Sequence, residues 1–219
     1  MMLEETGANR QISAPESLDA FARRCHSAGC PHLCGCCCCC HLGVACEETD
    51  GSIIPFASGD CITASTKADG QADFPNMIGF GTAYKPTQIP FGPTLDLTTA
   101  QRDLAFSVPR DGVIKAIDAH FTVYTPLSCS HANITLHAQL YQADRLSDVF
   151  TAIPGAQVNL SPGFAGNAPQ GAVSEGFLTN LSIPVTARNR LLLVFYATAC
   201  GACPAQSVIG FADAGVWIG

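Results

Sequence analysis

The fold class is decided by residues 103–141, which read Asp103-Leu-Ala-Phe-Ser-Val-Pro-Arg-Asp-Gly-Val-Ile-Lys-Ala-Ile-Asp-Ala-His-Phe-Thr-Val-Tyr124 and, after a short break, Ala132-Asn-Ile-Thr-Leu-His-Ala-Gln-Leu-Tyr141. In the first run, apolar residues from Ile117 to Val123 alternate with Asp118, His120 and Thr122. The second run alternates in the same way from Ile134 to Tyr141. A period of two is typical of antiparallel strands that have one face on a core and a wetter opposite face.

A tight turn is expected at Pro109-Arg-Asp-Gly112, after a short apolar strand at Leu104–Val108. Pro109 fixes its own φ, Asp111 can accept a bond from its own backbone, and Gly112 tolerates a positive φ.

The sequence from residue 51 onward is rich in Val, Ile, Thr, Phe, Gly and Pro, with turn signals at short intervals. We expect strands near 53–57, 61–66, 76–82, 104–108, 113–124, 133–142, 157–160, 177–184, 190–199, 206–213 and 215–218. Many short, evenly spaced strands predict an all-β antiparallel sandwich or jelly roll. The chain therefore divides into a tail, residues 1–50, and a jelly-roll domain, residues 51–219.

The segment Leu191-Leu-Leu-Val-Phe-Tyr196 is apolar on both faces of a strand. It is either a central strand covered on both sides or a strand at a subunit interface. The interface alternative makes candidates of Leu191, Leu193 and Phe195, together with Trp217 near the end of the sequence.

A short amphipathic helix is expected at residues 14–27. Ser13 and Glu16 form a capping-box pattern, and an apolar stripe follows at Leu18, Phe21, Ala22 and Cys25.

The segment 25–46 holds nine of the 13 cysteines: Cys25, Cys30, Cys34, Cys36, Cys37, Cys38, Cys39, Cys40 and Cys46. Adjacent residues lie too close for an ordinary disulfide, so alternate thiols of the run are better placed to bond other chains. Intermolecular cross-linking is one interpretation. The other is a zinc or copper site, since Cys alternates there with His26, His32 and His41, although spaced Cys-x2-Cys pairs are missing.

Other cysteines have simpler interpretations. Cys200-Gly-Ala-Cys203 has the spacing of a redox motif, but it follows a strand rather than opening a helix, so a local disulfide or two plain thiols is expected. Cys61 and Cys129 are expected to be buried small hydrophobic residues.

Composition excludes several function classes. The net charge is -7 and no basic run occurs, which argues against nucleic acid and anionic membranes as partners. No span is long enough to cross a bilayer, and the acidic start, Met-Met-Leu-Glu-Glu-Thr, does not suit a signal peptide. Asp118, His120, His131 and His137 come with no catalytic motif, so we expect polar pairs, no cofactor and no enzymatic activity.

Eight blocks between Ile53 and Gly215 occur in an order that resembles a known family, among them Ile53-Ile-Pro-Phe-Ala-Ser-Gly59, Met77-Ile-Gly-Phe-Gly81, Leu104-Ala-Phe-Ser-Val-Pro-Arg-Asp-Gly112, Phe150-Thr-Ala-Ile-Pro-Gly155 and Gly210-Phe-Ala-Asp-Ala-Gly215. They are similar to the C-terminal domain of the exosporium glycoproteins of the BclB type, which belong with the collagen-like spore-surface proteins. The resemblance implies a jelly roll of the C1q and tumour-necrosis-factor kind, assembled as a homotrimer. It also implies a location on the bacterial spore surface, after synthesis in the mother cell without a signal peptide.

Two features depart from that family. These 219 residues hold no Gly-X-Y run and thus no collagen stalk, and a cysteine-rich segment stands in its place. The interpretation is a structural spore-surface protein whose trimeric head is anchored to other surface proteins through tail disulfides. The alternatives are a zinc- or copper-binding protein and a head that binds glycan or host protein.

Overall fold

The computed structural model describes residues 51–200 and 205–219, and the chain divides into two units, Met1–Thr49 and Asp50–Gly219. The elements of the described residues are all β-strands. The expected helix at 14–27 and the cysteine-rich segment 25–46 lie outside the described residues.

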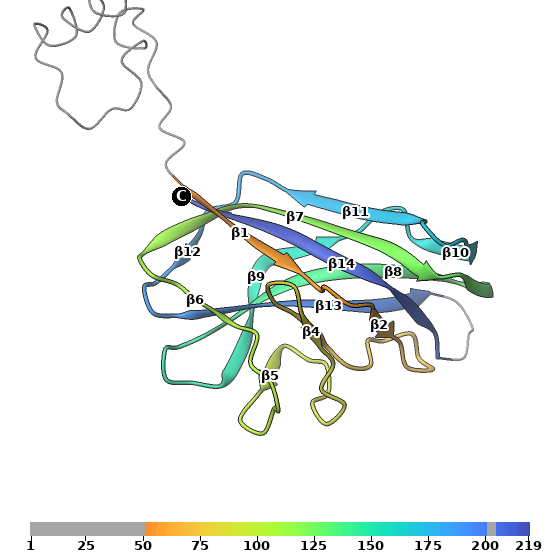
Figure 1. Ribbon diagram of the computed structural model, residues 1–219, viewed down its shortest axis with the longest axis horizontal. Coiled ribbons are helices and arrows are strands. Elements are labelled where there is room, and N and C mark those ends of the chain that lie inside the picture. The colour runs from red at the N-terminus through yellow and green to blue at the C-terminus, as the bar shows by residue number, and fades with distance from the viewer. Residues whose placement is uncertain (1–50, 201–204) are drawn as a thin grey trace, which may run out of the picture. The chain divides into compact units, whose positions relative to one another are not determined.

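The second unit is built from two antiparallel sheets that lie one over the other (Figure 1). In the first sheet the order is β1 (Ser52–Ala57), β14 (Ser207–Ile218), β7 (Gly112–Thr125) and β11 (Val173–Leu178), with β2 (Ile62–Ser65) beside β14 and β12 (Ile183–Val185) beside β7. In the second the order is β4 (Ala83–Tyr84), β3 (Asn76–Ile78), β13 (Arg190–Cys200), β8 (Leu127–Ala143), β9 (Val149–Asn159) and β5 (Thr94–Asp96), with β6 (Phe106–Ser107) beside β13 and β10 (Phe164–Ala168) beside β8.

Strand neighbours come from distant parts of the chain. The first strand, β1, pairs with the last, β14, and β3 pairs with β13. The chain passes from one sheet to the other between β2 and β3, β6 and β7, β7 and β8, β10 and β11, β12 and β13, and β13 and β14. This interleaved order is that of a jelly roll, and the expected all-β antiparallel sandwich is confirmed.

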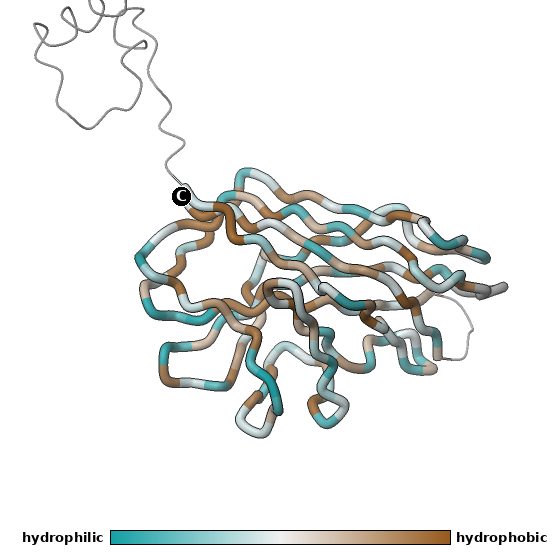
Figure 2. The backbone as a smooth tube through the Cα atoms, in the orientation of Figure 1, coloured by the Kyte–Doolittle hydropathy of each residue, from teal (hydrophilic) through white to brown (hydrophobic). Residues whose placement is uncertain are grey.

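The core between the sheets follows from the alternation in β7. Ile117, Ala119, Phe121 and Val123 are buried, while Asp118 is exposed and His120 and Thr122 are half-buried. From the other sheet, alternate residues of β13 complete this core. Figure 2 shows apolar residues along the strands of both layers. The expected alternation of the first run is confirmed.

A second core covers the outer face of the β13–β8 pair. Leu192, Val194 and Tyr141 pack there against Ile89 and Leu95, which belong to the segment between β4 and β6. Tyr141 was expected on the wetter face of its strand, and this expectation is wrong because that segment folds over it. For the same reason β13 is buried on both faces.

The link between β6 and β7 also differs from expectation. β6 pairs with β13 and β7 pairs with β14, so residues 108–111 carry the chain from one sheet to the other. The Asp111 carboxylate accepts a bond of 2.7 Å from the N–H of Ala187 rather than from its own backbone. The φ angle of Gly112 is not positive. A Cβ atom at this residue would lie 2.7 Å from the Ile218 side chain. Close packing therefore explains this glycine.

Candidate functional site

One face of the molecule combines exposed apolar side chains with acids. It consists of the outward positions of β1, β14, β7 and β11, and is called the outward face below. Its residues are Ile53, Pro55 and Ala57 on β1, Phe211, Asp213, Gly215 and Trp217 on β14, Ala116, Asp118, His120, Thr122 and Tyr124 on β7, and Val173, Glu175 and Phe177 on β11.

Large apolar side chains are concentrated on this face. Six of the nine exposed large hydrophobic residues in the described part of the chain lie there: Ile53, Tyr124, Val173, Phe177, Phe211 and Trp217. Ile53 is 73% exposed and lies opposite Trp217, which is 37% exposed. The rings of Tyr124 and Phe211 meet edge to face at 5.5 Å. Apolar side chains grouped in this way on a soluble domain are typical of an interaction surface.

A polar row crosses the middle of the outward face. The strand register aligns Asp213 of β14, His120 of β7 and Glu175 of β11. His120 Nδ1 lies 3.3 Å from a carboxylate oxygen of Asp213. Asp118 follows on the same side of β7, two residues from His120. The one Lys or Arg on these four described strands is Lys115 of β7, which lies between the buried Ile114 and Ile117 at the break in register opposite Trp217.

A shallow groove of about 460 Å³ opens beside this row, at the edge of β11. It is lined by Asp118, Ser161, Glu175, Gly176 and Phe177. The groove therefore has an aromatic wall and two carboxylates, which continues the character of the outward face.

The opposite sheet presents a different surface. His137 of β8 lies with Nδ1 2.7 Å from Asn159 of β9 and Nε2 2.8 Å from Thr198 of β13. Its ring stacks on Tyr196 at 4.7 Å, and Tyr196 packs on Phe91 at 4.1 Å. Burial lowers the pKa of His137, and the bond to Asn159 opposes the shift. These contacts confirm the expectation of a cross-strand polar pair for His137.

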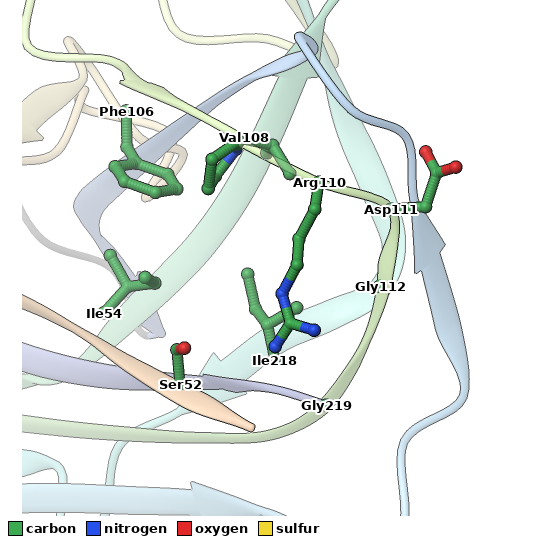
Figure 3. Close-up of a pocket in the computed structure, with 10 residues that line it drawn as sticks. Ser52, Ile54, Phe106, Val108, Arg110, Asp111, Gly112, Ile218 and Gly219 are labelled. Carbon is green, nitrogen blue, oxygen red and sulfur yellow. The ribbon is translucent and has the colours of Figure 1, made fainter. Parts of the chain in front are cut away.

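A small apolar cavity of about 90 Å³ lies at the end of the sandwich, where the last residues meet β6 and β7. Figure 3 shows Ile54, Phe106 and Val108 along its wall, and Arg110 extending toward Ser52 and Ile218. The Asp111 side chain points away from it (Figure 3). A cavity this small, with one charged side chain at its rim, offers no constellation for chemistry.

Three of the four interface candidates need correction. Leu191, Leu193 and Phe195 have at most 1% of their surface exposed and lie in the core between the sheets. They have no surface to give to a second chain, because the alternative of a central strand covered on both sides is the one the chain adopts. Trp217 is the exception, since it lies on the outward face.

The cysteines described by the structure are exposed. Cys61, expected to be buried, is an exposed free thiol in the link between β1 and β2, so that expectation is wrong. Cys200 is exposed at the end of β13, while its expected partner Cys203 lies outside the described residues. The side chains of Cys129 and His131 are likewise outside the described part.

Sequence reasoning missed most of the outward face. Phe211, Asp213 and Trp217 alternate with the buried Val208, Ala212 and Val216, but apolar residues occur on both sides of β14 and obscure the period of two. The available signal was the contrast in size, because small residues face the core while large aromatic ones face outward.

No family model matches the chain. Collagen-like protein 1 of Acanthamoeba polyphaga mimivirus is 30% identical over 175 residues, which cover 76% of this chain and 18% of that protein. The chain thus spans less than one fifth of the length of this relative.

Two solved structures show a remote likeness. The structure of Eiger TNF from S. frugiperda aligns with a TM-score of 0.35 at 10% identity, covering 75% of this chain and 91% of that one. The structure of the infectious bursal disease virus Gx strain aligns with a TM-score of 0.28 at 10% identity, covering 77% and 40%.

Two kinds of feature are missing from the described residues. The described residues include no helix long and apolar enough to cross a membrane. Nor do they bring together three His, Cys, Asp or Glu side chains in a group that could hold a metal ion.

Proposed function

We propose that residues 51–219 are the self-assembling head of a structural protein, that the head is a homotrimer, and that the protein acts by assembly rather than by catalysis. The observation that carries this proposal is the outward face, where six large apolar side chains are exposed on one sheet. Burying them against other copies of the chain removes apolar surface from water, which is the main favourable term in association.

The mimivirus relative supports an assembly of three chains. That protein is named collagen-like protein 1, and collagen winds three chains into one triple helix. A domain similar to part of such a protein suits an assembly of three chains. The block-by-block resemblance to exosporium glycoproteins supports the finer proposal that this head lies on a bacterial spore surface, bound to other surface proteins through the cysteine-rich tail.

The test measures the mass of the full-length chain in reductant by analytical ultracentrifugation. The wild type is expected to sediment as a trimer, and Phe177→Ser as a monomer or a much weaker trimer. Phe177 is 63% exposed, so its loss leaves the core intact. Truncating an aromatic hot-spot residue typically costs an interface about 2 kcal/mol or more.

Leu146→Ser is the matched control, because Leu146 is 87% exposed but lies between β8 and β9, away from the outward face. It should remain a trimer with wild-type stability. A monomeric wild type, or dissociation by Leu146→Ser but not by Phe177→Ser, would show that the outward face does not assemble the protein.

A further inference from the structure

We propose that assembly through the outward face takes up protons, so that the oligomer is held more tightly as the pH falls from about 8 to about 5. This inference rests on the proposed function and names how the same surface is regulated. It follows from what the strands place beside the exposed aromatic residues.

The ionisable groups of the outward face are strongly unbalanced. The row Asp213–His120–Glu175 and the neighbouring Asp118 supply three carboxylates and one imidazole. β1 adds no titratable side chain, and the remaining titratable groups on β7 are the amine of Lys115 and the phenol of Tyr124. His120 is the cation that the strand register sets beside the carboxylates, while Lys115 lies farther along β7, at the break in register opposite Trp217.

Burying this face in the assembled trimer removes water from the carboxylates. Asp and Glu side chains are normally ionised at neutral pH, so the carboxylates of each chain bring three negative charges to the contact, against the one positive charge of Lys115. Charges that are taken out of water without partners are costly, and like charges brought together add to that cost. Association is therefore opposed at high pH by the same face whose apolar residues favour it.

Lowering the pH relieves this opposition in two stages. An imidazolium at His120 has Asp213 at 3.3 Å on one side and Glu175 opposite it on the other, so it is a charge partner for both carboxylates. Further acidification neutralises the carboxylates themselves. The assembled state then binds more protons than the separated chains, so the association constant falls as the pH rises. If each chain takes up one proton, the constant for three chains changes by about a thousandfold per pH unit.

The experiment follows assembly of the full-length chain by analytical ultracentrifugation from about pH 5 to about pH 8, at constant ionic strength and in excess reductant. Dilution calorimetry in two buffers of different ionisation enthalpy counts the protons released on dissociation. The variant Asp118→Asn/Glu175→Gln/Asp213→Asn keeps the shape of the face and removes its charges. It should assemble at high pH as tightly as the wild type does at low pH, with its pH slope largely lost.

Two further variants locate the effect. His120→Gln can still donate a hydrogen bond to Asp213 but cannot gain a charge, so the slope near neutral pH should shrink. Asp144→Asn removes an exposed carboxylate between β8 and β9, outside the outward face, and should follow the wild type. A trimer equally stable at every pH, or an undiminished slope in the triple variant, would overturn this inference and leave the proposed function standing. A monomer at every pH would instead overturn the proposed function and this inference with it.

Discussion

Gly210 shows how a single residue fixes the packing behind the outward face. It lies on β14 at a break in register with β7, and a Cβ built there would meet the carbonyl oxygen of Thr122 at 2.1 Å and the Phe121 ring at 2.6 Å. We expect Gly210→Ala to lower the free energy of unfolding by about 1–3 kcal/mol, because overpacking forces backbone and ring to shift. Urea unfolding at fixed protein concentration measures the change.

Gly92→Ala is the control for this prediction. A Cβ at Gly92 meets its nearest neighbour at 3.7 Å, which is ordinary contact, and its φ is not positive. Its stability should stay close to that of the wild type. Equal stability of the two variants would mean that β14 and β7 do not approach as closely at the bulge as described.

At the scale of elements, β13 and β14 show what sequence patterns can and cannot predict. The alternation of β7 was predictable, because polar residues mark its outward side. In β13, however, Leu191–Tyr196 is apolar throughout, and only the segment between β4 and β6 decides that its second face is covered within the chain. The covering of this face depends on contacts between residues about a hundred positions apart in the sequence, and a local hydrophobic period does not indicate such contacts.

The same limit applies to β14. Two strands were expected there, at 206–213 and 215–218, yet one strand runs from Ser207 to Ile218. Gly215 lies opposite Pro55 of β1 and Asp118 of β7, within continuous pairing on both sides. The pairing of β14 with β1 and β7 places Phe211, Asp213 and Trp217 on the outward face. The candidate site could therefore be identified only once the order of the strands was known.

His137 joins three neighbouring strands, and its titration predicts a pH dependence of folding. Its pKa is lowered in the folded chain, first by burial, from the ordinary value of 6.5. The unfolded chain therefore binds more protons below that value. The stabilisation is complete above about pH 6.5 and is lost as the pH falls below it, which is opposite in sign to the proposed effect on assembly.

The measurement is urea unfolding at pH 7.5 and pH 5.5, about one unit above and below the ordinary titration of His. It uses the Phe177→Ser background, in which assembly is weakened. The added substitution His137→Gln should reduce the loss of stability on acidification, because Gln does not titrate. An unchanged pH slope would show that His137 is not the group responsible.

At the scale of the whole molecule, the proposed assembly uses different chemistry in the head and in the tail. The head offers apolar surface and carboxylates, whereas nine of the 13 cysteines lie in the segment 25–46 of the tail. Non-covalent trimers joined covalently to their neighbours would give a layer that resists dissociation on dilution. The two kinds of contact are separable by experiment, because reductant acts on one and pH on the other.

Replacing Cys36–Cys40 by Ser in the full chain tests this division. Without reductant, the wild type is expected to form multiples of the trimer that fall to single trimers when reductant is added, and the variant to remain a single trimer throughout. Cys61→Ser and Cys200→Ser, which remove the exposed thiols among the described residues of the head, serve as controls and should still form the multiples. Native mass spectrometry without chelator reads both results. If the multiples persist in the Cys36–Cys40 variant, the bonds lie elsewhere; if the wild type is a single trimer that carries the added mass of zinc or copper, the tail binds metal instead of joining chains.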